Sequence, residues 1–190
     1  MRSFVAGVVV TLLVLFVAGL LTAQFGLFPT RADATPPAVE QRIAMSALDA
    51  SMERNAPRVT NPIPATDENL IDGLKIYTMN CAVCHGTMDY KASPLEHSMY
   101  PPPPQIILDP VDDPEWHVYY AIRTGVRYTG MPAWDRALGD ADLWKLTAVL
   151  SRLEKLPPGV QDYWKKTYGV SPSTRPAGER EPGGGHEHHD

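Results

Sequence analysis

The stretch Cys-Ala-Val-Cys-His-Gly at residues 81–86 decides how the rest of the chain is interpreted. Cys81 and Cys84 stand three positions apart, and His85 follows directly. At the end of a helix, residues at i and i+3 share one face, so both thiols point the same way with the imidazole beside them. The stretch therefore predicts a site in which two sulfur atoms and one imidazole act together.

Three kinds of site use cysteines at this spacing. C-x-x-C-H is the attachment motif of a c-type haem, whereas a thioredoxin-like redox pair and half of a zinc site are the alternatives. Cys81 and Cys84 are the only cysteines in the sequence, so no second C-x-x-C completes a zinc site, and no βαβ pattern surrounds them. We therefore predict one covalently bound haem c, held by Cys81 and Cys84, with His85 as an iron ligand.

The beginning of the chain is strongly apolar. Residues 4–28 carry no charge, and a helix of that length would span about 37 Å, more than the bilayer core of about 30 Å. A cleaved signal peptide is the alternative, because residues 32–34 (Ala-Asp-Ala) resemble a cleavage site. An apolar region of a signal peptide has only about 7–15 residues, so we expect residues 1–28 to form a transmembrane anchor.

Prolines and apolar periodicity divide the chain after the anchor. Residues 29–65 are predicted to form a proline-rich tether with a possible short helix between Pro37 and Asn55. Residues 66–158 are predicted to form the globular domain, which contains long proline-rich loops after the C-x-x-C-H motif. Its helices are expected to run from Thr66 into Cys81, over 115–124 and over 140–156.

The last predicted segment, residues 159–190, is a C-terminal extension that we expect to be largely disordered, because it is rich in Pro, Gly and Ser beyond Ser171. Three of its aromatic residues are candidates to dock on the globular domain, namely Tyr163, Trp164 and Tyr168. Three of its histidines are candidates for loose binding of a transition metal, although a solvated tail is the simpler reading: His186, His188 and His189.

The order of helix, C-x-x-C-H motif, irregular loops, Met-Pro and final helix resembles the class I monohaem cytochromes c over residues 65–157. The resemblance implies an all-α fold in which the first and last helices cross beside the haem. Gly73 matches the small residue at that crossing, and Tyr77 matches the aromatic residue one turn later. Val149 departs from the family, because many members have an aromatic residue at that position.

The resemblance also implies the second iron ligand. Met131, in the stretch Thr-Gly-Met-Pro-Ala-Trp at residues 129–134, matches the distal methionine of the family. A thioether is soft and uncharged, so it favours ferrous iron and raises the reduction potential. His97 and Met99 remain alternative distal ligands, because both lie in the loop after the motif.

Further side chains are expected around the haem. A ligating histidine needs an acceptor on its other ring nitrogen, and the family implies a proline carbonyl from one of the residues 101–104. Haem propionates need charge-assisted partners. The candidates for this role are Arg127, Tyr128 and Trp134, with Arg123 as a weaker one.

A haem with both axial positions filled by protein transfers single electrons rather than binding a substrate. We therefore expect an electron-transfer protein and not an enzyme, in a bacterial inner membrane, with one membrane span and its globular domain in the periplasm. It would serve a respiratory chain as a tethered carrier or as the haem subunit of a larger complex. Its expected partners are a quinol-oxidising complex or a terminal oxidase, with neither nucleic acid nor a small-molecule substrate.

Charge narrows the kind of partner contact. Between Thr66 and Val160 the chain has 13 acidic and 8 basic residues, so this domain does not offer a basic surface to an acidic partner. We expect the partner to be met through tethering or through apolar contact around the haem edge. The alternative function is a haem enzyme or gas sensor in which Met131 is displaced by a small ligand.

Overall fold

The computed structural model describes residues 2–27 and 29–176. The histidines His186, His188 and His189, candidates for loose binding of a transition metal, lie outside the described residues. The chain divides into two compact units, Met1–Ala34 and Thr35–Asp190, and each is described by itself.

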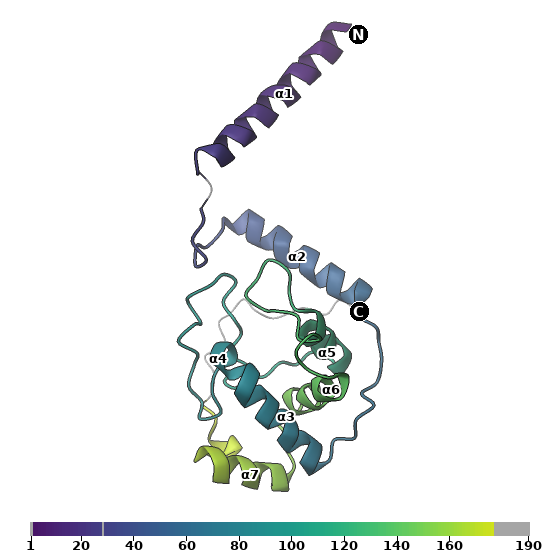
Figure 1. Cartoon of the computed structure of the whole chain (residues 1–190), viewed down its shortest axis with the longest axis vertical. Helices are drawn as coiled ribbons and strands as arrows, with labels where there is room; N and C mark the ends of the chain where they lie inside the picture. Colours follow the sequence, from purple (N-terminus) through teal and green to yellow (C-terminus); the bar gives the residue numbers. More distant parts are fainter. Residues whose placement is uncertain (1, 28, 177–190) are drawn as a thin grey trace. The chain divides into compact units, whose positions relative to one another are not determined.

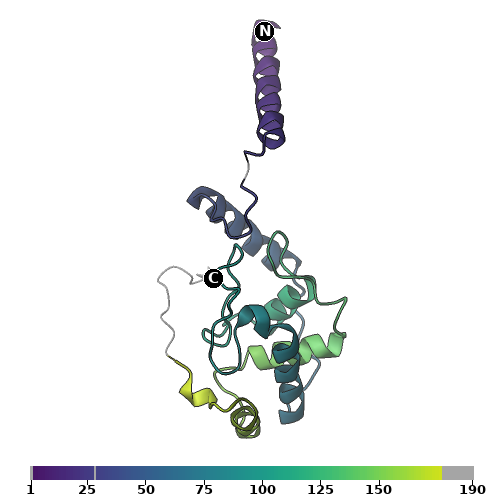
Figure 2. The same cartoon turned by 60° about the vertical axis from the view of Figure 1, so that its left-hand side comes forward.

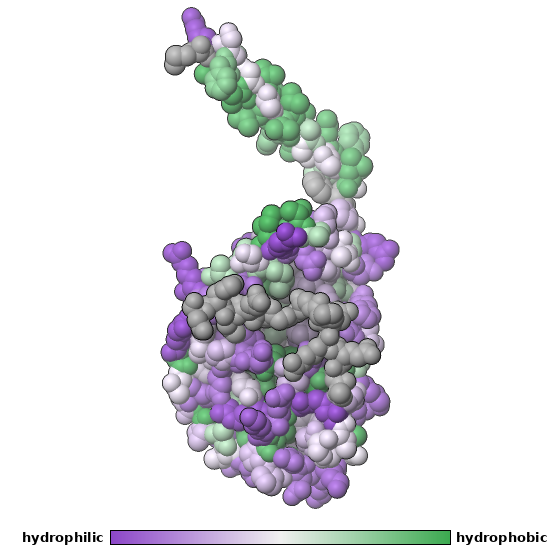
Figure 3. Space-filling model, turned by 180° about the vertical axis from the view of Figure 1, so that it is seen from behind, coloured by the Kyte–Doolittle hydropathy of each residue, from purple (hydrophilic) through white to green (hydrophobic). Residues whose placement is uncertain are grey.

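The first unit consists mainly of α1, Arg2–Gln24, a helix of 23 residues in which no residue is buried. Figure 3 shows an almost continuous hydrophobic surface along this helix. Among the described residues, α1 alone is long and apolar enough to cross a membrane, by length and composition. At about 1.5 Å per residue it spans about 35 Å, which is sufficient for the hydrocarbon core of a bilayer.

The second unit is helical (Figures 1 and 2), and no strand occurs in the part of the chain that the structure describes, apart from one isolated bridge between Thr87 and Lys91. The predicted all-α fold class is therefore confirmed. The elements are α2 (Ala38–Asn55), α3 (Asp67–Asn80), α4 (Ala82–His85), α5 (Glu115–Thr124), α6 (Asp140–Leu150), α7 (Pro158–Tyr168) and the short 3-10 helix η1 (Pro172–Thr174).

The centre of the fold is the packing of α3 against α6. Thr66 caps α3 by accepting a hydrogen bond from the backbone N–H of Asn69. Gly73 faces α6, and a Cβ atom there would collide with the carbonyl oxygen of Lys145 and lie 2.9 Å from Cγ1 of Val149. Gly73 therefore lies at the crossing that the family resemblance implies, because its missing side chain lets the two backbones approach closely.

The helix α6 ends at Leu150, six residues before the expected end. The backbone N–H of Ser151 still bonds to the carbonyl of Thr147, but residues 151–155 then form turns and a bend. Leu153 and Leu156 remain buried in those turns. Apolar spacing alone overestimated the helix, because a turn can bury leucines as well as a helix does.

The folded unit extends beyond both ends of the expected 66–158 domain. On its N-terminal side, Met52 and Ala56 are buried and Ile63 packs against the core, so part of the 29–65 segment is docked. On its C-terminal side, α7 begins at Pro158, continues into the 159–190 extension and buries Val160 and Trp164 completely. The indole Nε1–H of Trp164 donates to the carbonyl of Met88 at 3.1 Å, so α7 is ordered by contact with the loop after the motif.

Candidate functional site

The two cysteines and the histidine share one helical turn. Cys81 lies between α3 and α4, and its carbonyl oxygen accepts hydrogen bonds from the backbone N–H groups of Cys84 (3.0 Å) and His85 (2.9 Å). Both cysteines are free, with Cys81 buried and Cys84 partly exposed. Burial raises the pKa of the Cys81 thiol to about 12, so the free thiol is protonated at neutral pH.

His85 is buried, and its Nδ1 lies 2.8 Å from the carbonyl oxygen of Pro104. A carbonyl only accepts, so Nδ1 carries the proton and Nε2 keeps its lone pair. Burial lowers the pKa of His85, and the hydrogen bond to Pro104 opposes that shift. The imidazole is thus neutral and oriented, with Nε2 free to bind a metal ion, and among residues 101–104 Pro104 supplies its acceptor.

Gln105 braces this arrangement, and the sequence analysis missed it. Its Nε2 donates to the carbonyls of Pro103 (2.8 Å) and Cys84 (3.1 Å), while its Oε1 accepts from the backbone N–H of Ser93 at 2.7 Å. One buried amide therefore joins the motif, the proline run and the intervening loop. The only available signal was a lone amide placed directly between Pro104 and the apolar Ile106.

Tyr77 supports the motif from the other side. Its side chain is completely buried, and its Oη lies 2.8 Å from the carbonyl oxygen of His85 and 2.9 Å from that of Gly86. Burial raises the pKa of Tyr77 well above its ordinary value, so the hydroxyl remains a donor. Tyr77, the aromatic residue one turn after Gly73, thus also fixes the backbone at His85, the candidate iron ligand.

The loop that carries Met131 is pinned to the end of α5. The backbone N–H of Val126 donates to the carbonyl of Met131 at 3.1 Å, and the N–H of Met131 donates to Oγ1 of Thr129 at 3.0 Å. Gly125 has φ +65°, and a Cβ there would clash with the backbone of Pro132. Met131 is partly buried and packs against the core, so its thioether is held within a closed loop.

The propionate candidates occupy different environments. Trp134 is partly buried, and its Nε1–H is buried without a hydrogen-bond partner among the described residues. Arg127 is exposed and lies over the ring of Tyr128, which is 86% exposed. Arg123 donates to the hydroxyl of Tyr119 at 3.2 Å. Trp134 is therefore the candidate that has an unmet need for an acceptor.

The two alternative ligands occupy different environments. The side chain of His97 is 90% exposed and lies beside Glu96. Met99 lies against Gly130, because a Cβ atom added to Gly130 would clash with the sulfur of Met99. The Met99 thioether therefore neighbours the loop that carries Met131. Across residues 2–27 and 29–176, no group of three or more His, Cys, Asp or Glu side chains is arranged to hold a metal ion.

These residues fit a haem c better than a zinc ion or a redox disulfide. Two thiols and a neutral imidazole share one turn, a thioether lies in a separate closed loop, and one buried indole N–H has no acceptor among residues 2–27 and 29–176. A carboxylate on the bound group would meet that need.

One comparison with known protein families agrees with this reading. Residues 68–148 match the family model described as "Cytochrome C oxidase, cbb3-type, subunit III", and the match includes the motif and the loop of Met131. In the solved "Kuenenia stuttgartiensis reducing HAO-like protein complex Kustc0457/Kustc0458", one chain aligns with 24% identity and a TM-score of 0.41. That alignment covers 50% of this chain and 48% of the other, so it spans about half of that protein's length. The comparison with curated proteins finds no match.

Proposed function

We propose that the chain is a c-type cytochrome whose haem-binding domain includes residues 68–148, and that it acts as a membrane-anchored monohaem electron carrier in a periplasmic respiratory chain. The observation that carries the proposal is the hydrogen bond between Nδ1 of His85 and the carbonyl of Pro104, on the turn that also holds Cys81 and Cys84. It supports a neutral imidazole whose Nε2 is free for iron.

In this proposal each residue has a separate task. Cys81 and Cys84 would hold the porphyrin through thioethers, His85 and Met131 would bind the iron, and Trp134 would donate to a propionate. Arg127 and Tyr128 remain candidates at the exposed rim of the haem. A bound haem c supplies the Fe(II)/Fe(III) couple, and the protein tunes it through ligand identity, hydrogen bonding and burial.

The surface around the motif supports a weakly charged contact with a redox partner. Three large apolar side chains on the motif helices and the Met131 loop are well exposed: Met79 (74%), Val83 (60%) and Tyr128 (86%). The domain also carries more acidic than basic residues. We therefore expect partner reduction to depend weakly on ionic strength, and a steep fall in rate with added salt would contradict apolar docking.

The partner that we propose is a quinol-oxidising complex or a terminal oxidase in the same bacterial inner membrane. The support for this location is α1, which is apolar and unburied along its whole length. A haem attached through cysteines implies a globular domain on the periplasmic side.

The ligand assignment separates the carrier from the haem enzyme or gas sensor. Oxidised holoprotein with methionine ligation should show the weak absorption band at the red end of the visible spectrum, and its reduced form should bind CO slowly. Met131→Leu should abolish the band and allow rapid CO binding, whereas Met99→Leu should retain the band. Rapid CO binding by the unaltered protein without that band would instead favour the enzyme or sensor.

A further inference from the structure

Residues 56–66, called the strap below, lie against the globular domain although they read as a flexible proline-rich tether. Ala56, at the start of the strap, and Met52, just before it in α2, are buried. Ile63, near the end of the strap, packs against the central core. Burial of apolar side chains at both ends holds the strap to the domain, because each such side chain contributes about 1 kcal/mol or more.

Hydrogen bonds fix the path of the strap between those ends. Nδ2 of Asn61 donates to the carbonyl of Trp144 in α6 at 3.2 Å, and its Oδ1 accepts from the backbone N–H of Ile63 at 2.9 Å. Nδ2 of Asn69 in α3 donates to the carbonyl of Pro64 at 2.9 Å. The strap is thus tied to both helices that form the centre of the fold.

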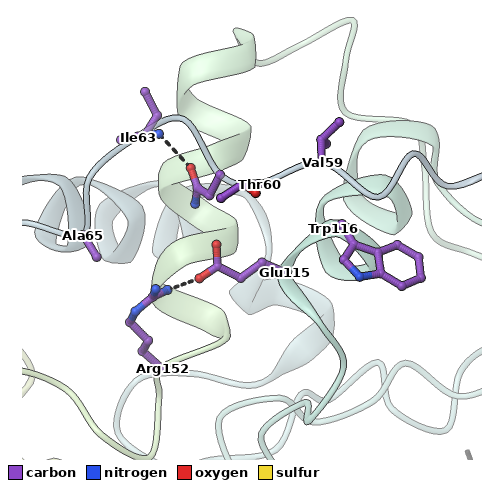
Figure 4. A pocket seen from close by; sticks show the side chains of 8 residues that line it. Val59, Thr60, Ile63, Ala65, Glu115, Trp116 and Arg152 are labelled. Carbon is purple, nitrogen blue, oxygen red and sulfur yellow. Dashed lines mark hydrogen bonds and ion pairs between the residues drawn. The ribbon is translucent and has the colours of Figure 1, made fainter.

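A shallow pocket of about 350 Å³ separates part of the strap from α5 and the end of α6. Figure 4 shows Val59, Thr60 and Ile63 of the strap along this pocket, with the ion pair between Glu115 and Arg152 facing them. At one end the guanidinium of Arg58 lies 4.9 Å from the ring centre of Trp116. The strap therefore also contacts α5, through a cation–π contact.

This docking shortens the chain that separates the domain from the proposed membrane helix. With a free strap, the 24 non-helical residues of the 25–66 segment and the helix α2 together would allow the haem domain to move up to about 110 Å from the membrane. With α2 and the strap docked, only the 13 residues 25–37 remain between the ends of α1 and α2, and they reach at most about 45 Å.

We propose that the docked strap shortens the free linker between the membrane helix and the haem domain. The shorter linker confines the haem domain to the bilayer surface and restricts it to redox partners embedded in the same membrane. This inference rests on the proposed membrane anchor. Its partner is an integral membrane protein whose electron entry or exit site lies within about 45 Å of the bilayer. A soluble carrier further from the membrane would be met by diffusion of that carrier and not by movement of this domain.

Limited trypsin digestion of the full-length holoprotein in detergent tests whether the strap is docked. Arg31 precedes α2, whereas the bond after Arg58 lies within the strap. We expect early cleavage after Arg31 and strong protection after Arg58, read from the N-termini of the fragments by mass spectrometry. Cleavage after Arg58 as fast as after Arg31 would overturn the proposal.

A matched pair of variants shows whether the strap contacts cause the protection. Asn61→Ala removes the bond to Trp144 and should accelerate cleavage after Arg58 about fivefold, since a lost hydrogen bond makes local opening easier. Gln161→Ala removes a similar amide-to-carbonyl bond, that to Leu156, outside the strap and should leave the rate unchanged. If both variants change the rate of cleavage after Arg58 equally, the contacts of the strap are not the cause of its protection.

The consequence for reach is tested with haem quenching of a fluorescent lipid headgroup in nanodiscs. An insertion of 20 Gly/Ser residues between Asp33 and Ala34 should lower quenching, as the effective concentration of haem at the bilayer falls about fourfold. The same insertion between Ala65 and Thr66 lies beyond the docked strap and should have little effect. An equal loss of quenching by the two insertions would overturn the proposal. Failure of all variants to enter nanodiscs would refute the membrane anchor. In that case the digestion experiment alone would test whether the strap is docked.

Discussion

Gly73 and Lys145 touch backbone to backbone where α3 passes α6: a Cβ atom on Gly73 would collide with the carbonyl oxygen of Lys145. The obstacle is main chain, so it cannot swing aside as a side chain would. Gly73→Ala is therefore expected to destabilise the protein by about 1–3 kcal/mol, despite the better helix propensity of alanine. Urea unfolding of the holoprotein measures this free energy, with the exposed Glu68→Ala variant as control. A loss of stability below about 0.5 kcal/mol in Gly73→Ala would contradict the close backbone contact between α3 and α6.

Asp72, next to Gly73, should make stability depend on acid. Its carboxylate accepts hydrogen bonds from Lys145 at 2.9 Å and Lys75 at 3.0 Å, and these lower its pKa. A lowered pKa means that the stabilisation is present above the unfolded value of about 3.9 and is lost as the pH falls through the folded value.

We therefore expect Asp72→Asn to be less stable at pH 7 by at most about 1 kcal/mol, and the difference to disappear in strong acid. Unfolding curves at pH 7, 5 and 3 measure this. Asp162→Asn, in α7, serves as control and should show no such convergence. A constant difference at every pH would show that the carboxylate charge is not responsible.

Gln105 is expected to matter both for stability and for the haem potential. Gln105→Leu leaves the Ser93 N–H and the Cys84 and Pro103 carbonyls without their partner, which should cost about 2–3 kcal/mol. Because the brace sets the path of Pro104, we also expect a weaker bond to His85, a less basic imidazole and therefore a higher reduction potential. A potentiometric titration that shows an unchanged potential would limit Gln105 to a structural role.

Trp134 provides a test of the propionate contact. Its buried Nε1–H has no partner among the described side chains and main-chain groups, so an acceptor on the haem would complete it. Trp134→Phe keeps the ring but removes the donor, and it should destabilise the holoprotein by about 1.5–3 kcal/mol, the range for a bond to a charged group. Equal or higher stability would mean that no propionate lies there, since removal of an unsatisfied buried donor is itself favourable.

The parts of the fold that were predicted from the sequence are those with local signals. The helix expected over 115–124 is α5 with the same bounds, because Pro114 precedes it and Gly125 ends it. The turn of Cys81, Cys84 and His85 follows from spacing alone. The close approach at Gly73 came from the family resemblance and is present in the structure.

The features that were missed depend on contacts between residues far apart in the sequence. Asn61 and Trp144 are 83 positions apart, and Trp164 and Met88 are 76 apart, so no local pattern indicates either bond. The prolines near the strap correctly predicted an extended chain but not where it lies. Likewise, an amide such as Gln105 has no apolar period to reveal that it is buried.

The covalent attachment of one haem through Cys81 and Cys84 is the claim on which the electron-carrier account depends most directly. Intact mass spectrometry of protein produced in a host that ligates haem should show the polypeptide plus one haem, and Cys84→Ala should lose the fully attached form. A mass equal to that of the bare polypeptide, from a host that matures other c-type cytochromes, would contradict the account.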